Sequence, residues 1–319
     1  MALLAALQPS RPAALMARWA EQEPARWDHH AQRLDEAHEL FDPALKRELI
    51  DRVIAHLVAL LRQAGERGVD LVLLPETCLP LGPCRPRIRE RLREACDYAE
   101  PRWLAALAPL ARQFSMVIAS SYYRAEGERL YNDGVVVDAD GTVAGIYHKV
   151  HLPCTETWEY TEAGLFEAGD EHTVIPTAVG RVGFQICYDI DFPEGSSALA
   201  LGGADLILHP TVGYNFPDEE EVVAEARLRT RATDNSVPLI YSNFGPVPGR
   251  SAVYGANGAM LACAGRTVDS LAMAEVPLPP VRPMSWGGEA SYPDHRQEMA
   301  GKRRPETYGI LTRARQEAD

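Results

Sequence analysis

The chain has 319 residues, of which 46% are hydrophobic and 24% charged, a composition typical of a globular protein that buries a substantial core. Its 45 acidic and 32 basic side chains give a formal net charge of −13, which argues against a nucleic acid or an anionic membrane as partner, because such partners select an excess of Lys and Arg. Six cysteines without paired spacing favour reduced thiols and a cytoplasmic location.

The N-terminal part predicts a strand, an irregular stretch and a helix. The opening MALLAALQPS lacks a basic leader and is too short for a secretory core, so we expect a buried first strand. Residues 9–41 are rich in proline and charge and are expected to form an irregular insertion. Asp42-Pro43 then indicates a helix start, and apolar residues follow at helical spacing as far as Gly65. No segment approaches the roughly 18 uninterrupted apolar residues of a membrane helix.

The rest of the chain mixes helix–strand units with hairpins, which indicates sheets covered by helices, either α/β or α+β. We expect a single domain over residues 1–319 that ends in a C-terminal arm at about 277–319, of which residues 277–307, rich in proline and charge, are expected to be irregular. The predicted elements, in chain order, are a strand (71–74), a helix disturbed by Pro109 (101–113), a strand (116–120), a hairpin about DADG (138–141), a hairpin about VGRVG (179–183), a helix and a strand in SSALALGGADLILHP (196–210), a helix (218–235), a strand (238–243) and a hairpin about ANG (256–258).

A thiol follows one of these strands in the segment GFQICYDIDFPE, at residues 183–194. A thiol nucleophile needs a base to take its proton and a positive group where the oxyanion forms. Three strand ends each offer one such side chain: Glu76 in LVLLPETCL, Lys149 in GIYHKVHLP and Cys187 in QICYDIDFPE.

These segments resemble the three signature segments of the nitrilase superfamily, the carbon-nitrogen hydrolases. Downstream, GADLILHPT, RLRTRATDN, GRSAVYGANGAMLACAG and KRRPETYGIL are similar to further parts of that family. The resemblance implies a four-layer αββα sandwich of two mixed sheets flanked by helices. It also implies a homodimer or larger homo-oligomer that hydrolyses a non-peptide carbon–nitrogen bond of a small molecule through a cysteine thioester, with no metal or organic cofactor.

The resemblance also assigns roles within the site. Glu76 is expected to act as general base, Cys187 as nucleophile and Lys149 as the cation beside the tetrahedral intermediate. The backbone N–H of Tyr188 would complete the oxyanion site. A second glutamate precedes a Gly-Asp pair in the family, and Glu162 occupies that position here.

Three other glutamates compete with Glu162 for this assignment, namely Glu156, Glu159 and Glu167. Nearby, residues 211–218 are expected to line the pocket, with Tyr214 and Phe216 in apolar contact with the substrate. The insertion at 9–41 would cover the pocket or a subunit interface with its tryptophan and histidine side chains, Trp19, Trp27, His29 and His30.

The residues after the nucleophile bear on the substrate. Tyr188-Asp189 resembles the amidase and carbamoylase branches, because true nitrilases have Trp-Glu there. Many relatives have an arginine where this chain has Asp191, and an acidic residue would attract a cationic substrate. The sequence therefore favours a small amide bearing an amino group; alternatives are an N-carbamoyl amine, an N-carbamoyl amino acid and a nitrile. Asp191 could instead cap the turn or pair with an arginine, while Asp189 and Glu194 are expected to hold the turn and open the next helix.

Two further alternatives come from different classes of protein. HKVHLPC, with His148, His151 and Cys154, suggests a metal site, but its spacing is not a zinc pattern and the two histidines would face opposite sides of a strand. We therefore expect no metal. A catalytically silent binding or scaffold protein is the other alternative, and the complete Glu-Lys-Cys set argues against it.

Overall fold

The computed structural model describes residues 1–12, 14–15, 18, 43–81, 88–153, 162–213, 218–247, 249–286 and 289–313. The chain divides into two compact units, Met1–Pro280 and Val281–Asp319, and the second begins close to the start of the expected C-terminal arm. The single domain, the cytoplasmic location and the homo-oligomer stay predictions. None of the helices in the described part of the chain has the length and apolarity that a membrane crossing requires.

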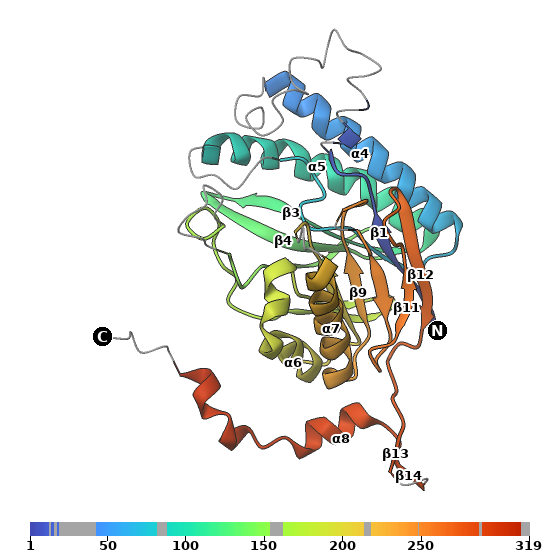
Figure 1. Ribbon diagram of the computed structural model, residues 1–319. Coiled ribbons are helices and arrows are strands. Elements are labelled where there is room, and N and C mark those ends of the chain that lie inside the picture. The colour runs from blue at the N-terminus through green and yellow to red at the C-terminus, as the bar shows by residue number, and fades with distance from the viewer. Residues whose placement is uncertain are drawn as a thin grey trace. The chain divides into compact units, whose positions relative to one another are not determined.

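The first unit contains a six-stranded sheet in the order β12-β1-β2-β3-β4-β5. β1, β2 and β3 run parallel, and the β1–β12, β3–β4 and β4–β5 pairs are antiparallel. Figure 1 shows α4 and α5 packed over one face of this sheet. The bounds are β1 Ala2–Gln8, α4 Pro43–Glu66, β2 Leu71–Leu73, α5 Arg89–Phe114, β3 Val117–Glu126, β4 Arg129–Val137, β5 Val143–His148 and β12 Ser270–Val276.

The second sheet of this unit also has six strands, in the order β11-β10-β9-β8-β7-β6. β7, β8 and β9 are parallel and the outer pairs are antiparallel, so this sheet is mixed like the first. α6 and α7 lie along its outer side (Figure 1). The bounds are β6 Val174–Thr177, β7 Gly180–Phe184, α6 Pro193–Leu201, β8 Leu206–Pro210, α7 Asp218–Asn235, β9 Leu239–Ser242, β10 Ala252–Tyr254 and β11 Met260–Cys263.

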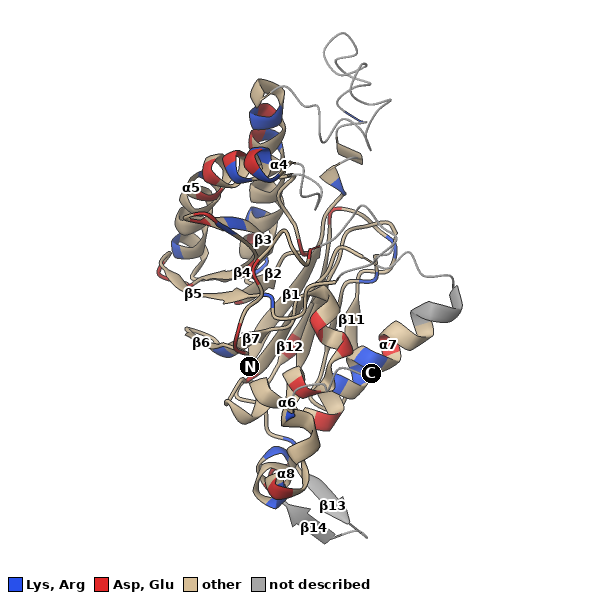
Figure 2. Cartoon of the chain, turned by 90° about the vertical axis from the view of Figure 1, so that its left-hand side faces the viewer, with Lys and Arg blue, Asp and Glu red and all other residues tan. Residues whose placement is uncertain are grey.

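Three apolar layers hold these elements together and confirm the four-layer αββα sandwich. One layer joins α4 and α5 to the first sheet, a second fills the space between the two sheets, and a third joins α6 and α7 to the second sheet. The inward face of α4 repeats at three- and four-residue steps, as an amphipathic helix requires. Its buried residues are Leu49, Ile50, Val53, Ile54, Leu57, Leu60, Leu61 and Ala64. Acidic and basic residues are interspersed along α4 and α5 in Figure 2.

The predicted second helix was too short. The sequence placed it at 101–113, but α5 starts at Arg89 and contains both Pro101 and Pro109. Both prolines are exposed, while Trp103 is fully buried and anchors the opposite face. Burial of the apolar face therefore outweighs the helix-breaking tendency of the two prolines.

The stretch from about 277 to 307, expected to be irregular, contains short regular elements. Two strands, β13 at Met284–Trp286 and β14 at Glu289–Tyr292, form an antiparallel pair. The helix α8 at His295–Lys302 follows, and its first turn is capped by the side chain of Asp294, which accepts from the backbone N–H of Arg296. The expectation of a wholly irregular arm was therefore wrong.

Gly134 on β4 tests the packing between the sheets. A Cβ built there would lie 2.7 Å from Cγ of Phe184, a buried residue of the opposite sheet. Gly134→Ala is expected to lower the free energy of unfolding by about 1–3 kcal/mol, because the sheets must separate or the ring must leave its rotamer. Chemical denaturation measures the change.

The control is Gly301→Ala, because a Cβ at Gly301 would meet no atom within 4 Å. This variant should match the parent protein or exceed its stability slightly, as alanine favours a helix. Equal stability of the two variants would contradict the packing described for the inter-sheet layer.

Candidate active site

Strand ends from both sheets supply the side chains of the site. Glu76 follows β2 and Lys149 follows β5 in the first sheet, whereas Cys187 follows β7 in the second. The carboxyl ends of parallel strands meet at one edge of a sheet, where ligand sites of layered α/β proteins commonly lie. The predicted side chains, far apart in sequence, converge at such an edge.

A buried cluster of two carboxylates, one ammonium group and one amide forms the floor of the site; we call it the carboxylate–lysine cluster. Lys149 Nζ lies 2.9 Å from Oε1 of Glu76 and 2.8 Å from Oε2 of Glu162. Asn132 Nδ2 donates to Glu76 Oε1 at 2.8 Å and to Glu162 Oε1 at 3.0 Å. All four side chains are buried.

The charges in this cluster shift the pKa values of Lys149 and Glu162. Burial by itself lowers the pKa of Lys149, but the carboxylates of Glu162 and Glu76 outweigh it and hold the pKa well above its usual value. Burial raises the pKa of Glu162, and the Glu76 carboxylate adds to the rise while Lys149 opposes it. Lys149 is therefore a permanent cation at neutral pH, which suits a group that stabilises an oxyanion.

Cys187 sits on a strained turn between β7 and α6. Its φ is 47°, in the left-handed region that non-glycine residues rarely adopt. Desolvation of the sulfur raises the pKa of the thiol well above its usual range; the Glu76 carboxylate adds to the rise and Lys149 opposes it. The thiol is thus protonated at neutral pH and needs a base to become a nucleophile.

Asp189 braces this turn with four hydrogen bonds to its carboxylate. Oδ2 accepts from the backbone N–H of Ile186 at 2.9 Å and from the Tyr147 hydroxyl at 2.8 Å. Oδ1 accepts from the backbone N–H of His151 at 2.9 Å and lies 2.8 Å from its ring Nδ1. Burial opposes ionisation, yet the bonds from His151 keep the pKa of Asp189 below its usual value. Asp189 therefore ties the cysteine turn to the segment that carries Lys149, the bracing role expected of it.

The segment after β8 forms a wall of the site. The backbone N–H of Val212 donates to Oε2 of Glu76 at 3.1 Å. A Cβ built on the next residue, Gly213, would lie 4.0 Å from the Cys187 sulfur. The carbonyl of Gly213 in turn accepts from Asn243 Nδ2 at 3.3 Å. One backbone segment thus contacts the carboxylate and borders the thiol.

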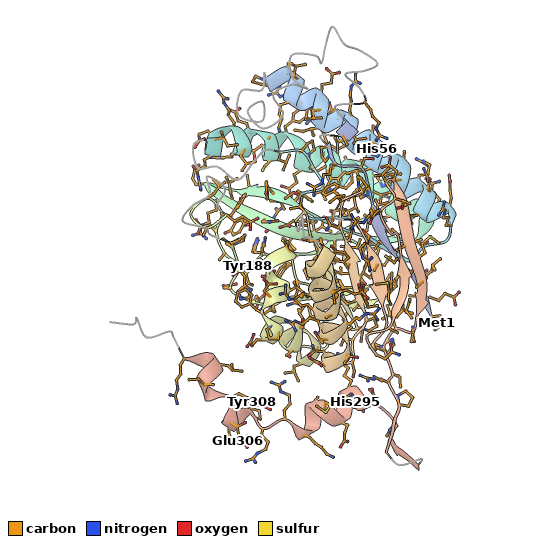
Figure 3. All side chains as sticks on the ribbon, in the orientation of Figure 1. Met1, His56, Tyr188, His295, Glu306 and Tyr308 are labelled. Carbon is orange, nitrogen blue, oxygen red and sulfur yellow. The ribbon has the colours of Figure 1, made fainter. Side chains whose placement is uncertain are left out.

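The other predicted residues have mixed outcomes. Tyr188, labelled in Figure 3, directly follows Cys187 and is 36% exposed. Asp191 forms an ion pair with Arg227 of α7, which is the alternative that the sequence left open. Glu167 is exposed, unlike Glu162. Outside the described residues lie Tyr214, Phe216, Glu156, Glu159, Cys154, Trp19, Trp27, His29 and His30.

The two histidines of HKVHLPC contact different aspartates. Nδ1 of His148 lies 2.7 Å from Oδ1 of Asp133, and His151 contacts Asp189. Their rings therefore point to separate partners, and the segment takes part in the bracing of the site.

Asn132 is a member of the carboxylate–lysine cluster that the sequence interpretation missed. It lies next to Asp133 in the buried part of the strand RLYNDGVVV, where a buried amide is unusual. Asp133 pairs with His148 across the predicted DADG hairpin, and the N–H of Lys149 donates to the carbonyl of Asn132 at 3.0 Å. Counting the register back from that turn would have brought Asn132 to within one residue of the lysine, and the bulge between Val136 and Val137 supplies the remaining shift.

The sandwich and the side chains at its strand ends define a class of protein, the enzymes that hydrolyse carbon–nitrogen bonds. A family model described as "Carbon-nitrogen hydrolase" matches residues 13–285, and the chain belongs to this family. The sequence-based assignment to the nitrilase superfamily is confirmed.

Curated relatives and solved structures agree with this assignment. The N-carbamoylputrescine amidase of Arabidopsis thaliana is 27% identical over 279 residues, which cover 81% of this chain and 89% of the relative. The citrullinase of Francisella tularensis is 30% identical over 195 residues, which cover 60% of this chain and 68% of the relative. A carbon-nitrogen hydrolase from Helicobacter pylori superposes with a TM-score of 0.68 at 26% identity, covering 82% of this chain and 94% of that one.

The raised pKa of the Cys187 thiol predicts how the rate of its alkylation depends on pH. The rate of Cys187 modification by iodoacetamide is expected to climb about tenfold per pH unit between about pH 7 and 9, since the thiolate fraction grows at that rate below the pKa. Peptide mapping by mass spectrometry separates Cys187 from the exposed Cys263 on β11, and Cys187→Ala identifies the peptide. A plateau in the rate below about pH 9 would mean that Lys149 holds a stable thiolate.

Proposed function

We propose that this enzyme hydrolyses a small linear amide or ureido compound that carries an amino group, through a thioester on Cys187. The observation that supports the roles is the carboxylate–lysine cluster, in which Glu76 contacts Lys149 at 2.9 Å and shapes the pKa of the thiol. A base, a fixed cation and a nucleophile then surround one point where a carbonyl could lie.

In the first half-reaction Glu76 takes the thiol proton as the sulfur attacks the carbonyl carbon. Oε2 of Glu76 accepts the Val212 N–H, and a carboxylate oxygen has a further lone pair for this proton. Lys149 and the backbone N–H of Tyr188 stabilise the oxyanion. The carbon–nitrogen bond breaks as Glu76 returns the proton to the departing amine, which leaves an acyl or carbamoyl thioester.

In the second half-reaction water replaces the amine. Glu76 removes a proton from this water as its oxygen attacks the thioester carbonyl, and the proton then returns to the departing sulfur. Lys149 stays charged throughout, because Glu162 and Glu76 hold its pKa well above its usual value. Glu162 and Asn132 keep the ammonium group and the base in place.

Two features support an amino group on the substrate. The cluster holds two carboxylates against one ammonium group, so its net charge favours a cation nearby. The similar proteins include an N-carbamoylputrescine amidase, whose name describes a ureido compound with a free amino group. This relative favours a ureido substrate as a second candidate beside a simple amide.

Ammonia release tests the proposal directly. A panel of cationic, neutral and anionic amides, ureido compounds and nitriles should give turnover with amine-bearing amides or ureido compounds and little with nitriles. Cys187→Ala should reduce kcat by about four orders of magnitude or more, because both half-reactions pass through the sulfur. A wild-type protein that releases no ammonia and forms no acyl adduct with an activated ester would instead be a binding or scaffold protein.

The contribution of Asp191 can be measured separately. Asp191 and Arg227 are each 29% exposed, so their pair is screened by water. If Asp191 also faces the substrate amine, Asp191→Asn should lower kcat/KM for 4-aminobutanamide by about two- to fivefold and leave butanamide unchanged. Arg227→Met frees the carboxylate of Asp191, so it should raise kcat/KM for 4-aminobutanamide relative to kcat/KM for butanamide. Equal changes for both amides would mean that Asp191 only anchors α7.

A further inference from the structure

Arg11 lies at the exit of β1 and bridges two loops at the edge of the site. Its Nη2 donates to the carbonyl of Val212 at 3.1 Å, and its Nε donates to the carbonyl of Val247 at 3.3 Å. Both partners are neutral carbonyl groups. The guanidinium has five N–H donors, so most of its donor capacity remains for another acceptor.

No carboxylate pairs with Arg11 among the residues that the structure describes. This sets it apart from Arg227, which pairs with Asp191, and from Arg124, which pairs with Glu100 and Asp133. The side chain is nevertheless half-buried, and this burial lowers the pKa of Arg11. A half-buried cation without an acid loses hydration that a bound anion would restore.

Val212 contacts both Arg11 and Glu76, and so connects Arg11 to the proposed reacting groups. The same residue whose carbonyl accepts from Arg11 donates its N–H to Glu76 at 3.1 Å. The following residue, Gly213, borders the Cys187 sulfur. A substrate bound with its carbonyl at the thiol would therefore extend along a wall that carries a cation at one end.

We propose that Arg11 binds a carboxylate of the substrate, which makes the substrate an amide or ureido derivative of an amino acid. This inference rests on the proposed function and adds a second charged group to the substrate, a carboxylate beside the amino group. Guanidinium and carboxylate match in geometry and form short charge-assisted hydrogen bonds. The negative cluster at the thiol and the cation at Arg11 together fit a zwitterion better than an amine alone.

Matched substrate pairs that differ only in the carboxylate test this assignment. Citrulline and N-carbamoylputrescine form one pair, and glutamine and 4-aminobutanamide form the other. Arg11→Met is expected to lower kcat/KM for the carboxylate-bearing member by about 10- to 100-fold, mainly through KM, and to change the other member little. Arg11→Lys should recover part of the loss, because the charge returns without the planar donor set.

The control is Arg62→Met, an exposed arginine on α4 that contacts Gln113, which should leave both ratios unchanged. An equal loss for both members in Arg11→Met would show that Arg11 only braces Val212, and this overturns the inference. If the wild-type enzyme turns over N-carbamoylputrescine or 4-aminobutanamide but neither citrulline nor glutamine, the inference is overturned and the proposed function stands. Absence of ammonia from all four compounds overturns the proposed function and the inference with it.

Discussion

The buried ammonium group of Lys149 is the constraint around which the site is built. A lone cation at this depth would be strongly destabilising, and removing one partner from a buried ion pair costs about 3–5 kcal/mol. Two carboxylates hold it at 2.8–2.9 Å, and Asn132 spans both of them, so no member of the set can move alone. These contacts connect β4 to the segments that follow β2 and β5, and they hold Glu76 and Lys149, the proposed base and cation, at a fixed separation.

Cys187, the proposed nucleophile, is held in a different way. Cys187 occupies a left-handed backbone conformation, and the four bonds to Asp189 stabilise that strained turn. Because two of those bonds come from His151, close after Lys149 in the chain, the thiol and the ammonium group share one support. Desolvation and the Glu76 carboxylate raise the pKa of the thiol, so in the proposed mechanism its reactivity depends on transfer of a proton to that carboxylate.

Much of this arrangement could be predicted from sequence, because strand ends, turn residues and signature segments are local features. Glu76, Lys149 and Cys187 belong to that group, and the hairpins follow from glycine and aspartate chemistry. The length of α5 escaped prediction since two exposed prolines mask a helix that tertiary burial maintains. The contacts of Asn132 and Arg11 could not be predicted, because their partners lie on other strands and loops. The pairing of Asp191 with Arg227 could not be predicted without the position of α7.

The apolar layer between the two sheets limits which substitutions the enzyme can accept without a change in reaction rate. The proposed base and cation follow strands of one sheet and the sulfur follows a strand of the other, so in the proposed mechanism the spacing of the two sheets bears on the distance of proton transfer from thiol to carboxylate. Face-to-face sheets lie about 10 Å apart, and a proton moves between heavy atoms only over a hydrogen-bond length. A Cβ on Gly134 would clash with the ring of Phe184, so we expect a bulkier side chain at Gly134 to change this spacing, and with it the reaction rate, while leaving every proposed reacting group intact.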